Sequence, residues 1–376
     1  MSTRAPSGPE RPGRGFTAEL RDAVTPRSMA LVAGVLVLQL GFILSYIGAF
    51  HSPTPHRIPV AVVAPDRVAG PVVARLNGLD GDPVKARTSG SEQDARRAIL
   101  ERDVEAAIII DPRGGTDTLL VASAGGPALS STAQLIAERL ETAEHRQVRV
   151  VDIRPPGAED GRGLSSFYLV IGWIVGGYLV AAILGIAGGA RPANPHRTLI
   201  RLGALAVYAV VSGLGGAVIA GPVLGALPGH LLALWAIGAL VVFATAAATV
   251  AFQVLFGMVG IGLAILVFVV LGNPSAGGAY PKPLLPAFWR AIGDWIPTGA
   301  ATTAVRNIVY FSGHDITRAL WVLAAYAVAG AAVAYGASAA RHRAEPPPSG
   351  GPPGGDRPGE GPAPRDAAPT APAAGP

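Results

Sequence analysis

Long apolar stretches separated by shorter polar ones dominate this chain. The longest, Leu231–Leu271, is apolar throughout except for Gln253 and small Ala, Gly and Thr residues. A straight helix of that length would be roughly twice the ~30 Å thickness of the hydrocarbon layer of a bilayer. The stretch therefore predicts two membrane crossings, with the break near Gln253 and Gly257, where an amide and a glycine allow the backbone to turn.

Four further apolar segments are each close to the ~20 residues that one membrane span requires. They are Met29–Phe50, Phe167–Ala187, Leu199–Ala220 and Leu320–Gly336. The pattern predicts an α-helical polytopic membrane protein with six transmembrane helices, the first at 28–50 and the other five within 166–340. The first segment could instead be a signal peptide, but its long apolar core and the lack of a clear small-x-small cleavage site favour an uncleaved anchor.

The segment 51–165, between the first two spans, has the pattern of a compact α/β domain. Ile58–Ala64 and Val104–Ile110 predict buried strands, and Leu119–Ala124 and Val148–Ile153 predict two further strands. Three runs with apolar residues at helical spacing lie between them, namely Val68–Leu79, Ser91–Glu101 and Ser130–Ala143. The alternation predicts a mixed sheet with helices packed on it.

The charged residues of this domain are predicted to have structural roles. A solvated face is expected on the second helix, from Glu92, Asp94, Arg96, Arg97, Glu101 and Arg102. Asp66, Asp111 and Asp152 lie at or near strand ends, where a carboxylate commonly caps a turn.

The arginines predict how the chain is oriented in the membrane. They concentrate in the arm 1–27, in the loop Ala190–Arg201 and after the last span, at Arg341 and Arg343. By the positive-inside rule both termini are cytoplasmic and the α/β domain is extracytoplasmic. The net charge of +5 comes mostly from these positions, so it indicates membrane topology and not a nucleic-acid partner.

Both ends of the chain are polar. Phe16–Val24 could form an amphipathic helix on the inner membrane surface or remain a solvated arm. Residues 341–376 are rich in Pro, Gly and Ala and predict a disordered cytoplasmic tail.

Residue types needed for several kinds of chemistry are missing from the sequence. The chain has no cysteine, its histidines are scattered without metal-ligand spacing, and neither Lys85 nor Lys282 is followed by Ser or Thr. A Walker A loop needs that pair to hold the nucleotide phosphates and Mg²⁺. We therefore expect no metal, no cofactor and no enzymatic activity in this chain.

Between their ends the predicted spans also contain no Asp, Glu, His, Lys or Arg. Proton- or ion-driven transporters usually keep such a residue at mid-depth as a relay. Two function classes remain: a permease powered by another polypeptide, or a scaffold or receptor that displays the external domain.

Two further patterns lie within the five-span region. Residues 284–311 predict two external helices at the membrane interface, Leu284–Ile296 with Trp289, Arg290 and Trp295, and Ala300–Phe311 with Arg306. Two pairs of glycines, four residues apart within each pair, predict close helix packing in the second span, unless they only reflect the general abundance of glycine: Gly172 with Gly176, and Gly185 with Gly189.

The layout resembles a known family. One span, a large α/β domain, and five spans with interface helices before the last are similar to the permease subunits of type-2 ABC exporters, in particular the phage-infection-protein-like (Pip-like) branch common in actinobacteria. The residues that carry the resemblance are the strands Ile58–Val63 and Val104–Ile110, and a block that runs through Leu271–Gly278, Leu285–Arg290, Trp295–Pro297 and Arg306–Asn307.

The resemblance implies a homodimer or paired permease in a lipid membrane, with a separate ATP-binding subunit and outward movement of lipid-like, drug or peptide cargo. It makes Phe16–Val24 and the loop with Arg191, Arg197 and Arg201 candidates for ATPase docking. The loop lacks the acidic coupling segment of many such permeases. Trp289, Arg290, Trp295 and Arg306 become candidates for an outer gate, with simple anchoring of the interface helices as the other interpretation.

Overall fold

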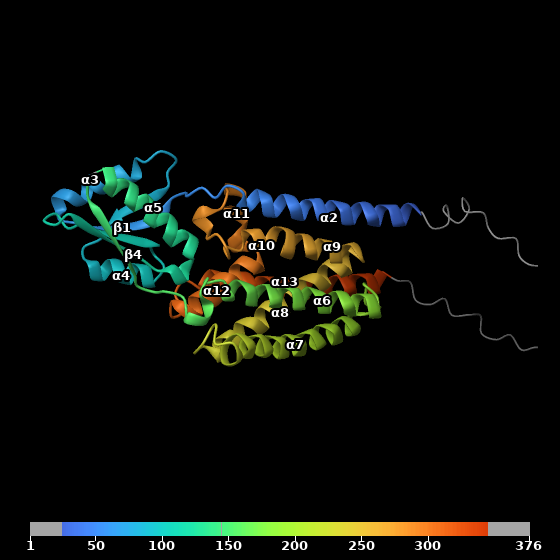
Figure 1. Cartoon of the computed structure of the whole chain (residues 1–376). Coiled ribbons are helices and arrows are strands. Elements are labelled where there is room, and N and C mark those ends of the chain that lie inside the picture. The colour runs from blue at the N-terminus through green and yellow to red at the C-terminus, as the bar shows by residue number, and fades with distance from the viewer. Residues whose placement is uncertain (1–24, 144, 345–376) are drawn as a thin grey trace, which may run out of the picture.

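The chain forms a bundle of long helices with a small α/β domain at one end (Figure 1). The computed structural model describes residues 25–143 and 145–344. The helix predicted at Phe16–Val24 and the tail after residue 344 lie outside the described residues. The first described helix begins, and the last one ends, at the end of the bundle far from the sheet.

Among the described residues, five helices are long and apolar enough to cross a membrane, so the chain is a multi-pass membrane protein. Two of these helices begin with a proline that follows a capping residue. At the helix that starts with Pro26, the Thr25 side chain accepts from the Ser28 N–H. At the helix that starts with Pro195, the Asn194 side chain accepts from the Arg197 N–H. The five helices are α2 (Pro26–Phe50), α6 (Ser165–Gly188), α7 (Pro195–Val218, continued by a π-helical turn at Ile219–Val223), α8 (Leu231–Phe256) and α13 (Thr317–Ala344).

The break expected in the longest apolar stretch is confirmed. Helix α8 ends at Phe256, and Gly257 follows with a φ of +65°, a conformation that favours glycine. The return segment is shorter than the ~20 residues that one membrane span requires, because its apolar helical part covers only Val259–Ser275. It consists of α9 (Val259–Ile265), a π-helical stretch at Leu266–Leu271 and α10 (Gly272–Ser275).

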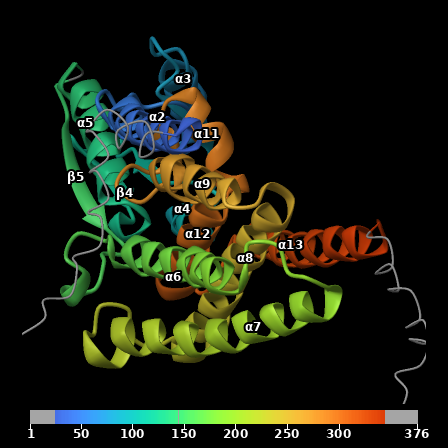
Figure 2. The ribbon, with the colours of Figure 1, turned by 90° about the vertical axis from the view of Figure 1, so that its right-hand side faces the viewer.

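Helix α8 is the central helix of the bundle, with α6, α7 and α13 packed around it (Figure 2). Glycines allow the close approach: a Cβ at Gly177 would come within 2.8 Å of the Val242 carbonyl, and one at Gly330 within 2.6 Å of the Ala248 nitrogen. By contrast, only 6% of the apolar window of α2 is buried, and α2 packs mainly on the Val259–Ser275 segment.

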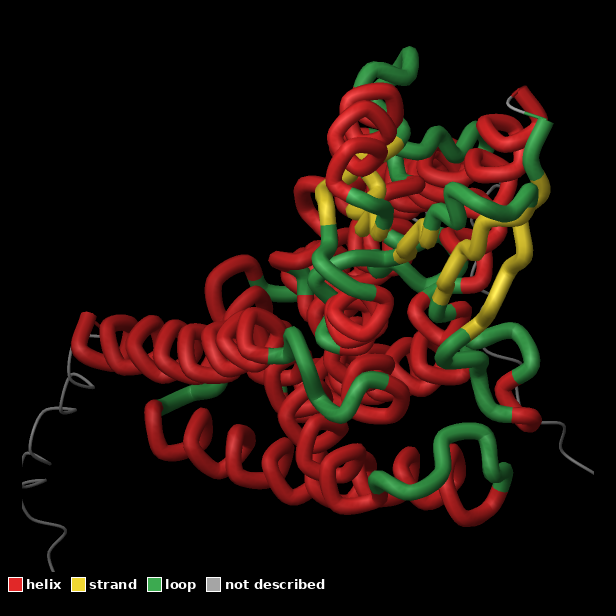
Figure 3. Tube along the Cα trace, turned by 90° about the vertical axis from the view of Figure 1, so that its left-hand side faces the viewer, coloured by secondary structure: helices red, strands yellow, loops and turns green. Residues whose placement is uncertain are grey.

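The α/β domain has a mixed five-stranded sheet in the order β2-β1-β3-β4-β5, which confirms the expected sheet class (Figure 3). Only the β3–β4 pair is antiparallel. The short, alternating strand β2 was not predicted. The strands are β1 (Ile58–Val63), β2 (Val84–Thr88), β3 (Ala106–Ile109), β4 (Thr116–Val121) and β5 (Gln147–Asp152).

The two faces of the sheet belong to different cores. Helices α3 (Asp66–Asn77) and α5 (Pro127–Ala143) cover one face, where Leu284 from the membrane region also packs. Helix α4 (Glu92–Leu100) covers the other face, whose core continues into the helix bundle. The continuous core joins the α/β domain to the helices.

Residues 276–311 fold differently from the two interface helices expected there. The first helix is divided into 3-10 turns at Lys282–Leu284 and Gly293–Trp295 around the short helix α11 (Ala287–Ile292). Helix α11 begins directly after Pro286. Gly293 follows its end and packs so closely on the Ser275 carbonyl that no side chain fits there. The second helix is confirmed as α12 (Pro297–Tyr310).

Candidate functional site

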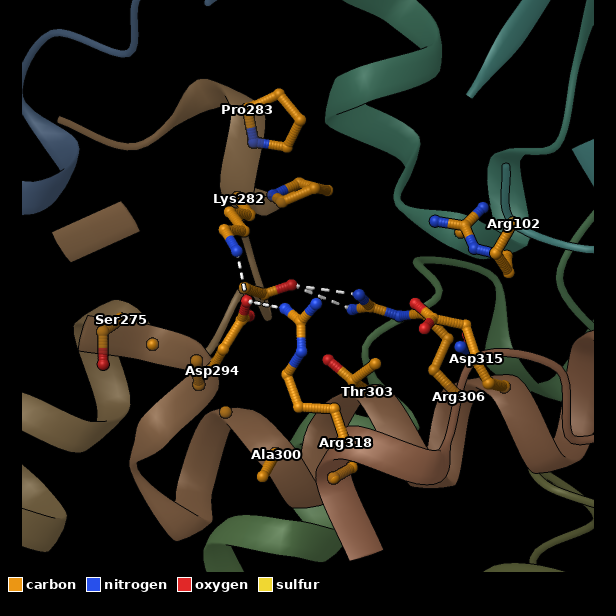
Figure 4. A pocket seen from close by; sticks show the side chains of 18 of the residues that line it. Arg102, Ser275, Lys282, Pro283, Asp294, Ala300, Thr303, Arg306, Asp315 and Arg318 are labelled. Atoms are coloured by element: carbon orange, nitrogen blue, oxygen red, sulfur yellow. Dashed lines mark hydrogen bonds and ion pairs between the residues drawn. The ribbon is translucent and has the colours of Figure 1, made fainter. Parts of the chain in front are cut away.

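A cavity of about 190 Å³ lies where the α/β domain meets the helix bundle (Figure 4). One wall comes from the α/β domain, at Arg102, Glu105 and Gly125. The other walls come from the end of α10 and the segment after it, from α12 and from the start of α13. Their charged and hydroxyl side chains are Ser275, Lys282, Asp294, Thr303, Arg306, Asp315 and Arg318.

The cavity exists because the segment after α10 reaches up to the α/β domain. The His56 N–H donates to the Pro283 carbonyl at 2.9 Å, and Leu284 enters the core of the domain. Gly126 has a φ of +146° and lies directly against Pro281, where a Cβ would overlap the proline ring. These contacts fix the two walls relative to each other.

Arg306 is the most buried cation of the cavity, with 7% of the residue exposed. Both of its terminal nitrogens donate to the Gly277 carbonyl at 3.1 Å, and one also donates to the Gly278 carbonyl at 3.3 Å. Its Nε is buried without a partner among the described residues. Burial, followed by the positive charge of Arg102, lowers the pKa of Arg306 to about 10.

Arg102 faces the cavity from the opposite wall. Its Nη2 donates to Glu105 at 2.8 Å, and its guanidinium lies 4.5 Å from the centre of the Phe311 ring. Its Nη1 is buried without a partner among the described residues and lies against Gly125, where a Cβ would be only 2.6 Å away. The expected solvated face is therefore wrong for Arg102, whose side chain is 11% exposed.

Asp294 balances two other cations at the mouth of the cavity. It forms ion pairs with Lys282 and, at 2.8 Å, with Arg318 at the start of α13. Figure 4 shows Lys282 and Arg318 converging on this carboxylate. One carboxylate thus serves two cations, and the lining as a whole has four cationic and three anionic side chains.

A second polar contact lies at the far end of α12. The Tyr310 hydroxyl donates to Asp160 at 2.6 Å, and the carboxylate also accepts from the Ser165 N–H at 2.9 Å. Burial, followed by the bond to Asp160, raises the pKa of Tyr310 above its ordinary value. The pair ties α12 to the linker that enters α6.

The four candidate gate residues do not form one cluster. Arg306 lines the cavity, whereas Trp289 is 9% exposed and packs against Ala49 and Leu285. Arg290 is half-buried and donates to the Leu285 carbonyl at 3.1 Å. Trp295 is 65% exposed.

The three candidate docking arginines lie at the end of the bundle far from the sheet, but two of them are engaged with helix ends. Arg191 donates to the Leu255 carbonyl at 3.4 Å, and Arg201 donates to the Gly189 carbonyl at 2.8 Å. Cations are favoured there because the last carbonyls of a helix lack partners. The side chain of Arg197 is exposed.

The four candidate packing glycines have different surroundings within the chain. A Cβ at Gly185 would come within 2.5 Å of the Gln253 amide on α8, and one at Gly176 within 3.2 Å of the Tyr208 hydroxyl on α7. Gly172 has no described atom within 4 Å of that position, and Gly189 follows the end of α6 with a φ of +85°. The closest contact on α6 instead involves Gly177.

Sequence reasoning missed most of the cavity. Arg102 and Arg306 are far apart in the chain, and no sequence pattern links them. Lys282 lies just before the expected interface helix and Asp294 lies within it, but the turns that bring the two together depend on packing. Among the described residues no group of three or more His, Cys, Asp or Glu side chains is placed to hold a metal ion.

Three of the four cations that line the cavity form ion pairs with carboxylates, whereas Arg306 donates only to backbone carbonyls. Comparisons with curated proteins and with solved structures found no match. A family model described as "Protein of unknown function (DUF3533)" matches residues 123–332, which include the α12 and α13 walls of the cavity. Because the match spans more than half of the 376 residues, the chain belongs to the DUF3533 family.

Proposed function

We propose that this chain is the permease subunit of a type-2 ABC exporter that moves a lipid-like, drug or peptide substrate outward. The supporting observation is the distribution of charge in the helices. In the five long described helices, each Arg and His lies within the first or last two turns, and none contains Asp, Glu or Lys. Without a titratable relay at mid-depth, the energy for transport has to come from another protein.

The proposal includes six membrane crossings, with Val259–Ser275 as the fifth. This segment is about 25 Å long at 1.5 Å per residue, slightly less than the ~30 Å hydrocarbon layer. It starts beside the arginine-rich end of the bundle and finishes beside the α/β domain, as a crossing requires. The arginine-rich end is cytoplasmic in this proposal, and the α/β domain lies outside.

In the same proposal the outer gate lies at the cavity, and residues 284–311 support it. Helix α12 contacts α6, α8 and α13 as well as the 3-10 turn Ser123–Gly125 of the α/β domain. A movement of the spans would therefore reach the domain through α12. Arg306 would act within the gate, while Trp289, Arg290 and Trp295 position its rim at the membrane interface.

A separate ATPase would dock at the cytoplasmic end, around Arg197. Two copies of the permease would pair.

The alternative is a scaffold or receptor that displays the α/β domain. One observation favours that alternative: Arg191 and Arg201, two of the three docking candidates, are occupied by helix-end carbonyls.

Purification of the full chain from its host membranes in a mild detergent tests the proposal. We expect an ATP-binding protein to co-purify, with ATP hydrolysis in the eluate. Arg197→Gln should reduce the co-purified ATPase, whereas the control Arg290→Gln, at the other end of the bundle, should not. An eluate without any ATPase, from cells that contain the full chain, would support the scaffold and contradict the permease.

A further inference from the structure

We propose that the cavity between the α/β domain and α12 binds a phosphate-type oxyanion, either as a free phosphate ester or as the headgroup of an anionic phospholipid. Oxyanion binding at this cavity would be a property additional to the proposed transport function. It holds for a permease and for a scaffold alike, because neither transport nor an ATPase is needed for it.

Arg306 has no carboxylate in direct contact. Its described hydrogen bonds all go to the neutral carbonyls of Gly277 and Gly278, and among the described residues no ion pair joins it to an acidic side chain. Glu105 and Asp160 act on it electrostatically from a greater distance, but burial still lowers its pKa. A buried cation without a directly bound counter-ion is costly, and an anion in the cavity would reduce that cost.

Arg102 places a second guanidinium on the opposite wall of the cavity. It belongs to the other domain, lines the same cavity, and acts electrostatically on Arg306, which is consistent with the two guanidinium groups repelling each other. Each has one buried nitrogen without a partner among the described residues, Nη1 in Arg102 and Nε in Arg306. An oxyanion between the walls would convert this repulsion into two charge-assisted contacts.

The cavity has the size and the hydrogen-bond donors that a phosphate group needs. Its volume of about 190 Å³ is more than ten times the ~10–15 Å³ that one water requires, so a group of several heavy atoms fits. A phosphate has oxygens in several directions and can accept from arginines on opposite walls. Thr303 adds a hydroxyl to one wall. The Asp294 carboxylate is paired with Lys282 and Arg318 and forms no ion pair with Arg306.

The test is the thermal unfolding of the full-length protein in a neutral detergent. Sodium phosphate is compared with sodium chloride at equal ionic strength, and short-chain phosphatidylglycerol is compared with short-chain phosphatidylcholine in the micelle. We expect a saturable rise in Tm with an anionic phosphate and none with chloride or phosphatidylcholine. A response to inorganic phosphate indicates a free phosphate ester, and a response to phosphatidylglycerol alone indicates a lipid headgroup.

The variants locate the binding. Arg306→Gln and Arg102→Gln should each weaken the apparent affinity at least tenfold, while Arg149→Gln, at an exposed arginine of β5 that does not line the cavity, should behave as wild type. If Arg306→Gln fails to fold, Thr303→Leu fills the cavity without removing a charge and should abolish the response. No response to either phosphate probe in the wild type, or wild-type titrations in Thr303→Leu or in folded Arg306→Gln, would overturn the proposal.

Discussion

Tyr310 donates a hydrogen bond of 2.6 Å to Asp160, a residue that lies 150 positions earlier in the chain. Asp160 is 3% exposed and follows the α/β domain, whereas Tyr310 ends α12. The contact therefore joins the end of α12 to the linker between the α/β domain and α6, and so connects the domain to the helices around the cavity. The contacts of Asp160 with the Tyr310 hydroxyl and the Ser165 N–H satisfy a carboxylate that burial would otherwise penalise.

Replacement of Tyr310 by phenylalanine should destabilise the protein. The ring would still pack, but Asp160 would lose its hydroxyl donor, at a cost of about 1–3 kcal/mol. We expect a lower Tm for Tyr310→Phe in detergent. Asp160→Asn keeps one acceptor oxygen for the Ser165 N–H, and its Nδ2 can donate to the Tyr310 hydroxyl, so this variant should lose less. An unchanged Tm for Tyr310→Phe would show that the contact contributes no stability.

The same pair predicts a response to alkaline pH. The folded protein raises the pKa of Tyr310 above 10 and so favours the neutral hydroxyl. This contribution to the free energy of unfolding is complete below the ordinary pKa and is lost as pH rises above it. The stability difference between wild type and Tyr310→Phe should therefore shrink between about pH 9 and about pH 11. A constant difference across that range would contradict the assignment.

Two glycines on α6 make a matched pair for helix packing. Gly177→Ala would place a Cβ within 2.8 Å of the Val242 carbonyl and 3.0 Å of the Thr245 Cβ, so α6 and α8 would have to separate, at a cost of about 1–3 kcal/mol. Gly172→Ala meets no described atom within 4 Å and should be neutral or stabilising by up to about 1 kcal/mol. Melting of both variants in detergent checks this, and equal losses would contradict the packing described.

Gly126 tests the junction between the domain and the bundle. Alanine there would overlap the Pro281 ring, and the φ of +146° is unfavourable for any residue with a side chain. We expect Gly126→Ala to loosen the docking of the α/β domain, seen as faster proteolysis near 276–285 and a lower Tm. Gly115→Ala, in the same domain but with no described atom within 4 Å of the added Cβ, is the control. Equal proteolysis of the two variants would show that the contact does not hold the junction.

The absence of cysteine from the sequence makes the topology directly measurable. Single cysteines at Asp80 in the α/β domain and at Ala279 beyond α10 should react with a membrane-impermeant maleimide in intact cells. Cysteines at Met258, between α8 and α9, and at Arg343 should react only after permeabilisation. All four positions are exposed. Labelling of Met258→Cys from outside would contradict the fifth crossing, and labelling of Arg343→Cys from outside would reverse the orientation.

The apolar pattern predicted the long helices and the turn at Gly257, because membrane-spanning length and glycine conformation are local properties. It did not predict strand β2, whose exposed, charged positions carry little apolar signal. Nor did it predict the cavity, because Arg102 comes from the end of α4 and Arg306 from the middle of α12. Their proximity depends on how the segment around Pro281 packs on the α/β domain, which is a tertiary contact between distant residues.

Site-directed photo-crosslinking in cells tests whether a separate ATPase docks at the arginine-rich end and powers this protein, as we propose. The crosslinker is placed at Arg197 and, as the control, at Trp295, both of which are exposed. We expect position 197 to crosslink to an ATP-binding protein and position 295 not to. No ATPase at position 197, or no more there than at position 295, would rule out docking at this end of the bundle.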